Sequence, residues 1–165
     1  MAILTILKFP DPRLRTVAQK VTKFDAELRR VMDDMYETMY HHQGVGLAAT
    51  QVNIHQRFFT MDISPKRDQP MCVINPEVIS QEGVQIDQHG CLSVGGGIAD
   101  NIKRAMHLRL RGQDIDGKVF ELDLSELAAI CVQHEIDHLN GKLFIDHLSR
   151  LKIERIRKKL EKYER

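Results

Sequence analysis

Residues 125–141 read SELAAICVQHEIDHLNG, and this stretch predicts the central helix of the fold. Ser125 is a typical N-cap residue, and Asn140-Gly141 is a typical helix end. Between them, the side chains that recur every three or four residues are those of Leu127, Ile130, Cys131, His134 and His138. That spacing is typical of one face of a helix.

Within this helix, residues 134–138 form the pattern H-E-x-x-H. Residues four positions apart share a helix face, so both imidazoles can aim at one metal ion with Glu135 beside it. The composition of the chain gives about 0.02 expected chance matches to this pattern, which argues against coincidence. A catalytic site of this kind needs a third protein ligand and leaves one position for water.

The third ligand decides the class of the metal site. Downstream of the helix, Asp146 and His147 have spacings that are not those of the H-E-x-x-H proteases. Upstream, Cys91 lies in a glycine-flanked segment where a thiolate can approach an ion. Cys72 and Cys131 lie among aliphatic residues and are predicted to be small buried side chains.

The bulk properties predict one domain spanning 1–165. The chain has 165 residues, 42% hydrophobic and 28% charged, and a net charge of +1 that argues against a surface devoted to nucleic acid. The start, MAILTILKFPDPRLR, breaks at Pro10 after a short apolar run, so no signal peptide is expected. No stretch reaches the ~20 apolar residues that cross a bilayer. With three cysteines and no secretion signal, we expect a soluble, cytoplasmic protein that uses no membrane.

Hydrophobic periodicity predicts the elements around the central helix. The predicted segments are a helix over 25–41, strands over 57–63 and 72–79, a hairpin of 107–110 with 119–124, and a helix from 149 to the end. Asp116-Gly117 supplies the hairpin turn. The predicted class is α+β, with antiparallel or mixed β-sheets around a central helix that carries H-E-x-x-H, and with a C-terminal helix.

Three motifs, in the family's order, make the chain similar to the peptide deformylases. Residues 44–51, GVGLAATQ, match the family's first motif, G-φ-G-φ-A-A-x-Q. Residues 90–93, GCLS, match the second motif, E-G-C-L-S, and residues 134–138 match the third. This family removes the formyl group from the N-terminal methionine of new bacterial polypeptides. Without the resemblance, residues 44–51 are consistent with a loop that only ends a helix.

Carried over by position, the resemblance implies that Cys91, His134 and His138 bind one divalent metal ion. It implies Fe²⁺ as the native ion, which Zn²⁺, Ni²⁺ or Co²⁺ can replace. A soft thiolate with two imidazoles suits all four metals, so the residues do not choose among them.

The resemblance also assigns catalytic and substrate-binding roles. Glu135 would take a proton from water and later give it to the leaving amine. The side-chain amide of Gln51 and the backbone N–H of Leu92 would stabilise the oxyanion. The residues implied in substrate binding are Gly44, Val45, Gly46, Ile130 and Cys131.

The chain departs from the family around the second motif. His89 stands where the family has Glu, and Arg104 matches the arginine that pairs with that Glu. A salt bridge at Arg104 therefore needs another acid. The segment Gly95-Gly96-Gly97 replaces a proline-containing one and is expected to loosen the cleft wall. Drift, reduced activity and altered substrate preference are all consistent with these changes.

Two other functions stay open on this sequence. One is another metallopeptidase or amidase, which an upstream cysteine ligand disfavours. The other is a non-catalytic metal- or peptide-binding paralogue with a closed metal site. On a strand, His89 and Cys91 would face the same side, so His89 could fill the water position as a fourth protein ligand.

The C-terminal segment 150–165 concentrates positive charge. It carries eight basic and three acidic residues, a net charge of +5 in a chain whose total is +1. A solvated helix face is one interpretation. The resemblance adds another, since some bacterial deformylases bind the ribosome through a C-terminal helix. The expected partners are thus formyl-methionyl nascent peptides and the ribosome, with the chain itself a monomer. The apolar stripe that would dock this helix comprises Ile153, Ile156, Leu160 and Tyr163.

Overall fold

In the computed structural model of the chain, the described residues are 2–95 and 98–163, with His89 and Tyr163 described by their backbone alone. The helices are α1 (Ala26–His41), α2 (Glu126–Leu139) and α3 (Arg150–Tyr163), with 3₁₀ turns at Pro12–Arg15, Ala49–Val52 and Phe144–His147. The strands are β1 (Gly46–Ala48), β2 (Phe58–Met61), β3 (Met71–Glu82), β4 (Gln85–His89), β5 (Asp100–Arg104), β6 (His107–Gln113) and β7 (Val119–Ser125). The predicted α+β class is confirmed.

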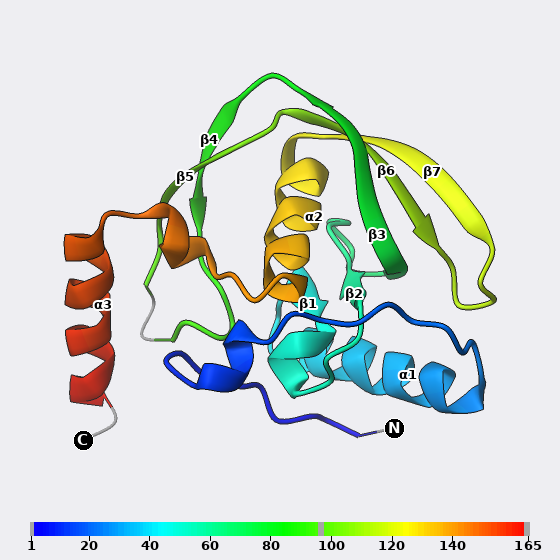
Figure 1. Cartoon of the computed structure of the whole chain (residues 1–165), viewed down its shortest axis with the longest axis horizontal. Helices are drawn as coiled ribbons and strands as arrows, with labels where there is room; N and C mark the ends of the chain where they lie inside the picture. Colours follow the sequence, from blue (N-terminus) through cyan, green and yellow to red (C-terminus); the bar gives the residue numbers. More distant parts are fainter. Residues whose placement is uncertain (1, 96–97, 164–165) are drawn as a thin grey trace.

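Two antiparallel sheets flank α2. Five strands pair in the order β1-β2-β3-β6-β7, and β4 pairs with β5 in a separate two-stranded sheet. Figure 1 shows α2 in the centre, with β3, β6 and β7 on one side and β4 and β5 on the other. This arrangement brings β1 and the segment after β4 to the face of α2 that carries H-E-x-x-H.

The first helix follows its prediction closely. The Asp25 carboxylate accepts a hydrogen bond from the backbone N–H of Leu28 at 3.0 Å, as an N-cap should. The apolar stripe of α1 packs into the core next to β1 and β2. The stripe's fully buried methionines are Met35 and Met39. These side chains are therefore part of the hydrophobic core.

The start of α2 differs from its prediction in one detail. Ser125 ends β7 and is the N-cap residue of α2, as predicted, but its hydroxyl forms a 2.7 Å hydrogen bond with Nδ1 of His107 across the hairpin and none with the first turn of the helix. The predicted side-chain cap is wrong because the strand register directs this hydroxyl sideways. The predicted end is confirmed, since Gly141 has φ +74°. A Cβ at Gly141 would also collide with the backbone of Arg15.

The hairpin of β6 and β7 is confirmed, with Gly117 at φ +84° in its turn. Both strands are longer than predicted, as is β3, whereas β2 is shorter. Strands β4 and β5 were outside the predicted elements. Their sequences, QIDQH and DNIKR, contain one isoleucine each and no apolar alternation. Their pairing with each other, rather than their composition, makes them strands.

The C-terminal helix docks on the body through its predicted stripe. Ile156 and Leu160 are buried in a cluster with Leu7 and Phe9 of the N-terminal arm. The side chain of Tyr163 lies outside the described residues. None of the described helices has both the length and the apolar character that crossing a bilayer requires.

Candidate metal and catalytic site

The H-E-x-x-H face of α2 and the segment after β4 form one cluster of potential metal ligands. Sγ of Cys91 lies 3.3 Å from Nε2 of His138, and this nitrogen lies 3.2 Å from Nε2 of His134. All three ligand atoms lie within 4.8 Å of one another. A tight turn, in which the N–H of Val94 donates to the carbonyl of Cys91 at 3.1 Å, holds the thiol toward α2.

These separations fit a tetrahedral divalent ion. With the usual metal–nitrogen and metal–sulfur distances, neighbouring ligand atoms lie about 3.3–3.6 Å apart. The two short separations in the cluster, 3.3 Å and 3.2 Å, agree with that geometry. One thiolate with two imidazoles is also a three-ligand set of the catalytic type. The residues present therefore fit a resident metal ion.

Burial controls the protonation of this cluster. It raises the pKa of the Cys91 thiol to about 12, and it lowers the pKa of His138 to about 4. His138 is therefore neutral, which is the form that binds metals. A bound divalent cation reverses the effect on the thiol, because it deprotonates a coordinating cysteine.

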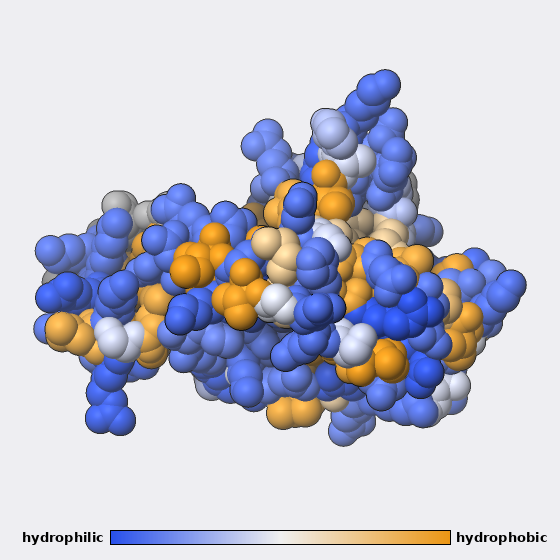
Figure 2. All heavy atoms as spheres, turned by 90° about the horizontal axis from the view of Figure 1, so that it is seen from above, coloured by the Kyte–Doolittle hydropathy of each residue, from blue (hydrophilic) through white to orange (hydrophobic). Residues whose placement is uncertain are grey.

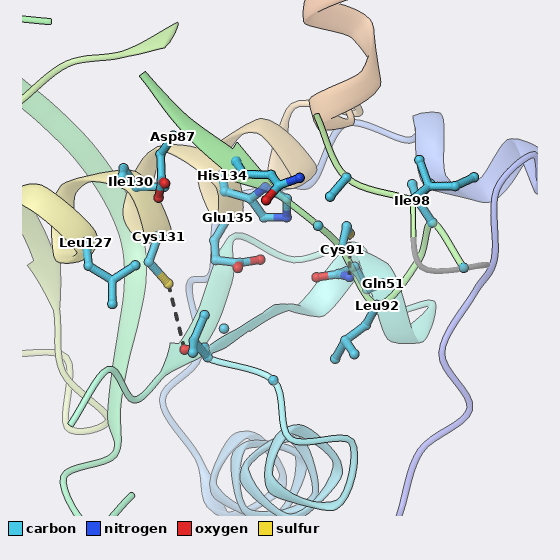
Figure 3. Close-up of a pocket in the computed structure, with 18 of the residues that line it drawn as sticks. Gln51, Asp87, Cys91, Leu92, Ile98, Leu127, Ile130, Cys131, His134 and Glu135 are labelled. Atoms are coloured by element: carbon cyan, nitrogen blue, oxygen red, sulfur yellow. Dashed lines mark hydrogen bonds between the residues drawn. The ribbon is translucent and has the colours of Figure 1, made fainter. Parts of the chain in front are cut away.

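Glu135 faces the cavity beside His134 (Figure 3). Its side chain is 3% exposed, and its Oε1 has no hydrogen-bond partner among the described residues. Burial raises the pKa of Glu135 to about 8, and a cation held by the neighbouring His134 and His138 would lower it again and favour the carboxylate. A buried carboxyl oxygen without a partner is costly to keep, so it is a strong candidate for contact with substrate or water.

The side chain of Gln51 has a defined orientation. Its Oε1 accepts a hydrogen bond from the backbone N–H of Ala48 at 2.9 Å. Its Nε2 therefore points the other way, donates to Oγ of Ser93 at 3.1 Å, and lies 3.6 Å from Sγ of Cys91. The amide N–H groups of Gln51 thus face the ligand cluster. Leu92 follows Cys91 directly and lines the same cavity.

A cavity of about 550 Å³ lies beside the ligand cluster. Its apolar wall is formed by Leu127, Ile130 and Cys131 of α2, and Val45 belongs to the β1 side. Sγ of Cys131 lies 3.7 Å from the carbonyl oxygen of Val45, the dashed line in Figure 3. Val45 is 44% exposed, so its side chain is free to contact a ligand. An apolar wall therefore lies beside the cluster of potential metal ligands.

The other candidate ligands of the sequence lie away from the cluster. Asp146 forms an ion pair with Arg15, and His147 contacts Asp137 at 3.0 Å. Asp137 also forms a 2.7 Å salt bridge with Arg104, whose side chain is 4% exposed. Asp137 is thus the other acid that Arg104 needs in the absence of the family's Glu.

The expectations for two further positions fall outside the described residues. His89 is described by its backbone alone, so its proposed fourth-ligand role is not addressed by the structure. The glycines at 96 and 97, expected to loosen the cleft wall, are also outside the described residues.

The sequence did not predict a group of polar contacts next to β1, formed by Arg67, Asp62 and Tyr40. The guanidinium of Arg67 donates to the carbonyl oxygens of Gly44 and Asp62, and it lies 5.2 Å from the centre of the Tyr40 ring. Burial would raise the pKa of Asp62, but hydrogen bonds from Ser64 and Tyr40 lower it to about 2. The signal in the sequence was an acid directly after the apolar strand FFTM. Through the hydrogen bond from Arg67 to the carbonyl of Gly44, these contacts fix the position of residues 44–46 beside the cavity.

Comparisons with known proteins agree over the whole chain. The family model described as polypeptide deformylase matches residues 3–154. A peptide deformylase of Azotobacter vinelandii is 55% identical over 166 residues, covering 100% of this chain and 98% of that protein. The crystal structure of a peptide deformylase from Legionella pneumophila matches with a TM-score of 0.94 at 44% identity, covering 99% of this chain and 96% of that one. A peptide deformylase from Ehrlichia chaffeensis, in complex with actinonin, matches with a TM-score of 0.95 at 37% identity over 100% and 99% of the chains. The chain therefore belongs to the polypeptide deformylase family.

Proposed function

We propose that this metal-dependent hydrolase removes the formyl group from the N-terminal formyl-methionine of new polypeptides and releases formate. The observation that carries the proposal is the cavity in which the cluster of Cys91, His134 and His138 meets the buried Glu135. The comparisons give no support to a non-catalytic, closed-site alternative, since the relatives are named peptide deformylases. We further propose a single catalytic domain, 1–165, that works in the cytoplasm as a monomer.

Cys91, His134 and His138 would hold the metal ion, with Fe²⁺ as the native one and Zn²⁺, Ni²⁺ or Co²⁺ as substitutes. When bound there, the ion would supply Lewis-acid polarisation of the formyl oxygen and a lower pKa for the attacking water. The neutral imidazole of His138 is ready to bind it without losing a proton.

Glu135 is the proton carrier in this proposal. Its carboxylate accepts a proton from the attacking water as the new C–O bond forms at the formyl carbon. It then donates that proton to the amine nitrogen as the C–N bond breaks. The products are formate and a peptide with a free amino terminus, and Glu135 ends the cycle as it began.

Gln51 and Leu92 supply hydrogen bonds to the oxygen that becomes negative. The amide of Gln51 is already oriented by Ala48 and Ser93, so it needs no reorganisation during the reaction. The backbone N–H of Leu92 is proposed as the second donor. Preorganised donors of this kind stabilise the charge that develops in the transition state, and losing one typically costs ~10²–10³ in rate.

The substrate would lie along β1. Gly44 and Gly46 line the cavity and allow the peptide backbone a close approach. The methionine side chain would occupy the apolar space between Val45, Ile130 and Cys131, which matches its polarity.

The function is tested by measuring formate release from formyl-Met-Ala-Ser with anaerobically purified, iron-loaded protein. We expect a free amino terminus to form from this peptide and not from acetyl-Met-Ala-Ser, which carries an additional methyl group at the carbonyl and would release acetate. No formate release from protein with one bound metal ion per chain would contradict the proposed function.

Gly46 gives Glu135 the space that it occupies. A Cβ at Gly46 would overlap Oε2 of Glu135 and would lie 2.8 Å from Sγ of Cys131. Since both side chains are buried, a methyl group must displace Glu135 from its position. We expect Gly46→Ala to lower kcat/KM for formyl-Met-Ala-Ser by about 10- to 100-fold, the effect of a small misplacement of a catalytic group.

Gly44→Ala is the comparison variant, because the one close contact of its Cβ would be the flexible end of Leu92 at 2.8 Å, and its next neighbour, the carbonyl oxygen of Gly46, lies at an ordinary 3.6 Å. We expect a smaller loss for it. Tm and metal content report whether either variant is misfolded. Equal losses in the two variants would show that Glu135 has no special need for this glycine.

We also propose that α3 contacts ribosomal RNA. Ile156 and Leu160 face the body, which leaves Lys158, Lys159 and Lys162 exposed to solvent. Figure 2 shows that the α3 end of the molecule, at the left, is mainly hydrophilic on this face. Exposed lysines neutralise phosphates and make such binding dependent on salt.

Replacing Lys158, Lys159 and Lys162 together with glutamine should weaken salt-sensitive co-sedimentation with ribosomes and leave formyl-peptide turnover intact. Each lost phosphate contact should reduce, by about 1, the steepness with which the logarithm of the binding constant falls with the logarithm of the salt concentration. Truncation near Leu151 should act in the same direction, although it also removes the cover of Phe9.

The matched control for α3 replaces three exposed lysines elsewhere, Lys20, Lys23 and Lys66, with glutamine. It removes the same charge from the chain. If both triple variants co-sedimented as the parent does, α3 would have no role in ribosome binding.

A further inference from the structure

The N-terminal arm of the chain passes beside two of the segments that form the metal and catalytic site. The backbone N–H of Leu7 donates to the carbonyl oxygen of Gln51 at 2.7 Å, and that of Phe9 donates to the carbonyl oxygen of Ser93 at 2.7 Å. Leu7 and Phe9 are buried, whereas Lys8 between them is exposed and lines the cavity. Two buried neighbours therefore fix the backbone of Lys8 at the edge of the cavity.

One peptide group connects Lys8 to the thiol of the ligand cluster. Nζ of Lys8 donates to the carbonyl oxygen of Leu92 at 2.5 Å. The N–H of that same peptide group belongs to Ser93, and it donates to Sγ of Cys91 at 3.4 Å. Figure 3 shows Cys91 and Leu92 together with Gln51 at one end of the cavity. The Leu92–Ser93 peptide group therefore has a cation at its oxygen and a potential metal ligand at its hydrogen.

This contact uses the charge of Lys8, and it lies over a buried hydrogen bond. Among the described residues no acid forms an ion pair with Lys8, and the carbonyl of Leu92 is the acceptor of its Nζ. Ser93 is fully buried. A cation at a carbonyl oxygen polarises the peptide and makes its N–H a stronger donor, by roughly 10–30% for each hydrogen bond in a chain.

A stronger N–H donor makes the sulfur a weaker electron donor to a metal ion. A bound divalent ion deprotonates a coordinating cysteine. The N–H of Ser93 and Nε2 of Gln51, which lies 3.6 Å from Sγ of Cys91, would then both donate to a thiolate. Hydrogen bonds to a ligating sulfur leave more of the positive charge on the ion. An ion with more positive charge polarises a carbonyl oxygen more strongly.

We propose that Lys8 is a positioning residue that tunes the metal ion through the Leu92–Ser93 peptide group. It holds this peptide with its N–H toward Sγ of Cys91 and strengthens that hydrogen bond. The inference rests on the proposed function, because it concerns the same metal ion. Lys8 takes no part in the proton transfer, so its effect should appear in kcat and leave KM for formyl-Met-Ala-Ser little changed.

The test measures the thiolate-to-cobalt charge-transfer band of the cobalt-substituted protein. Lys8→Met keeps the length of the side chain and removes its charge, so the thiolate should become a stronger donor and the band should move to lower energy. Lys8→Arg keeps a cation that can reach the carbonyl of Leu92, and it should restore the parent's band. With iron bound, Lys8→Met should lose about two- to fivefold in kcat, the scale of polarisation through one peptide group. Lys8→Arg should lose less.

The matched control is Lys20→Met, because Lys20 is an exposed lysine outside the cavity. It should keep the parent's band and the parent's kcat. Lys8→Gln is also uncharged and should repeat the band shift of Lys8→Met, so the result does not depend on the folding of a single variant. Tm and cobalt content are measured for each protein.

High salt separates the effect through the peptide from the general field of an exposed cation, since about 1 M salt screens charges over about 3 Å. The band shift should persist there. An unchanged band in both uncharged variants at one cobalt ion per chain, or a shift that vanishes at high salt, would overturn the inference. The spectrum requires no turnover, so an absence of formate release from every form would overturn the proposed function instead.

Discussion

Replacing Glu135 with glutamine is expected to lower kcat by at least about 10²–10⁴-fold while the metal ion stays bound. The two side chains have the same shape, and Glu135 is buried at 3% exposure, so the variant should keep its packing. A carboxamide cannot accept a proton from water, so the variant lacks the group that takes the proton in the proposed mechanism. The loss should therefore fall on the chemical step and leave KM for formyl-Met-Ala-Ser little changed.

The measurement combines formate release with metal analysis of the same preparation. Glu126→Gln is the matched control, because Glu126 is an exposed glutamate on the same helix. It should retain the parent's rate. A near-normal rate for Glu135→Gln at full metal occupancy would refute the proposed role of Glu135.

The second large effect is expected at Cys91. Cys91→Ala removes one of three ligands and leaves only the imidazoles of His134 and His138, whose Nε2 atoms lie 3.2 Å apart. Changes around a metal ligand already cost about 10–100-fold in affinity, so the loss of the ligand itself should exceed that range. Metal content after gel filtration, and competition with a chelator, measure this loss directly.

The variant Cys91→Asp replaces the thiolate ligand with a carboxylate, whereas Cys91→Ala removes the ligand altogether. An aspartate can still bind a divalent ion, so this variant should keep its metal with an altered ligand field and altered activity. The cobalt-substituted forms should show the change in their visible spectra. Cys72→Ala, in a cysteine remote from the cluster, should leave metal binding unchanged. If Cys91→Ala bound metal as tightly as the parent, Cys91 would not be the third ligand.

Asp137 balances the charge of Arg104, whereas Nε and Nη2 of Arg104 have no hydrogen-bond partner among the described residues. A buried arginine without a counter-charge would be strongly destabilising. Asp137, on α2 between Ile136 and His138, accepts its hydrogen bond at 2.7 Å and also contacts His147. The cation is thus balanced from the helix that carries the metal ligands. Nothing in the short-range pattern of the sequence links residues 104, 137 and 147.

Local patterns were sufficient for much of this protein. Helical spacing and end signals predicted α1 and α2 almost to the residue, because caps and glycine stops act within one turn. The Asp-Gly turn predicted the β6–β7 hairpin for the same reason. The H-E-x-x-H pattern put His134, Glu135 and His138 on one face of α2, since residues four apart share a face whatever surrounds the helix.

The tertiary structure alone decided what depends on contacts between distant segments. It placed Sγ of Cys91 at 3.3 Å from His138, where the sequence by itself left the third ligand open until the family resemblance was considered. It paired β4 with β5, although neither has the alternation of a strand. It also turned Asp87 inward and Ile86 outward, against their polarity. Burial and pairing across the chain outweigh local preference at such positions, so the chemical lining of the cavity could only be read from the folded molecule.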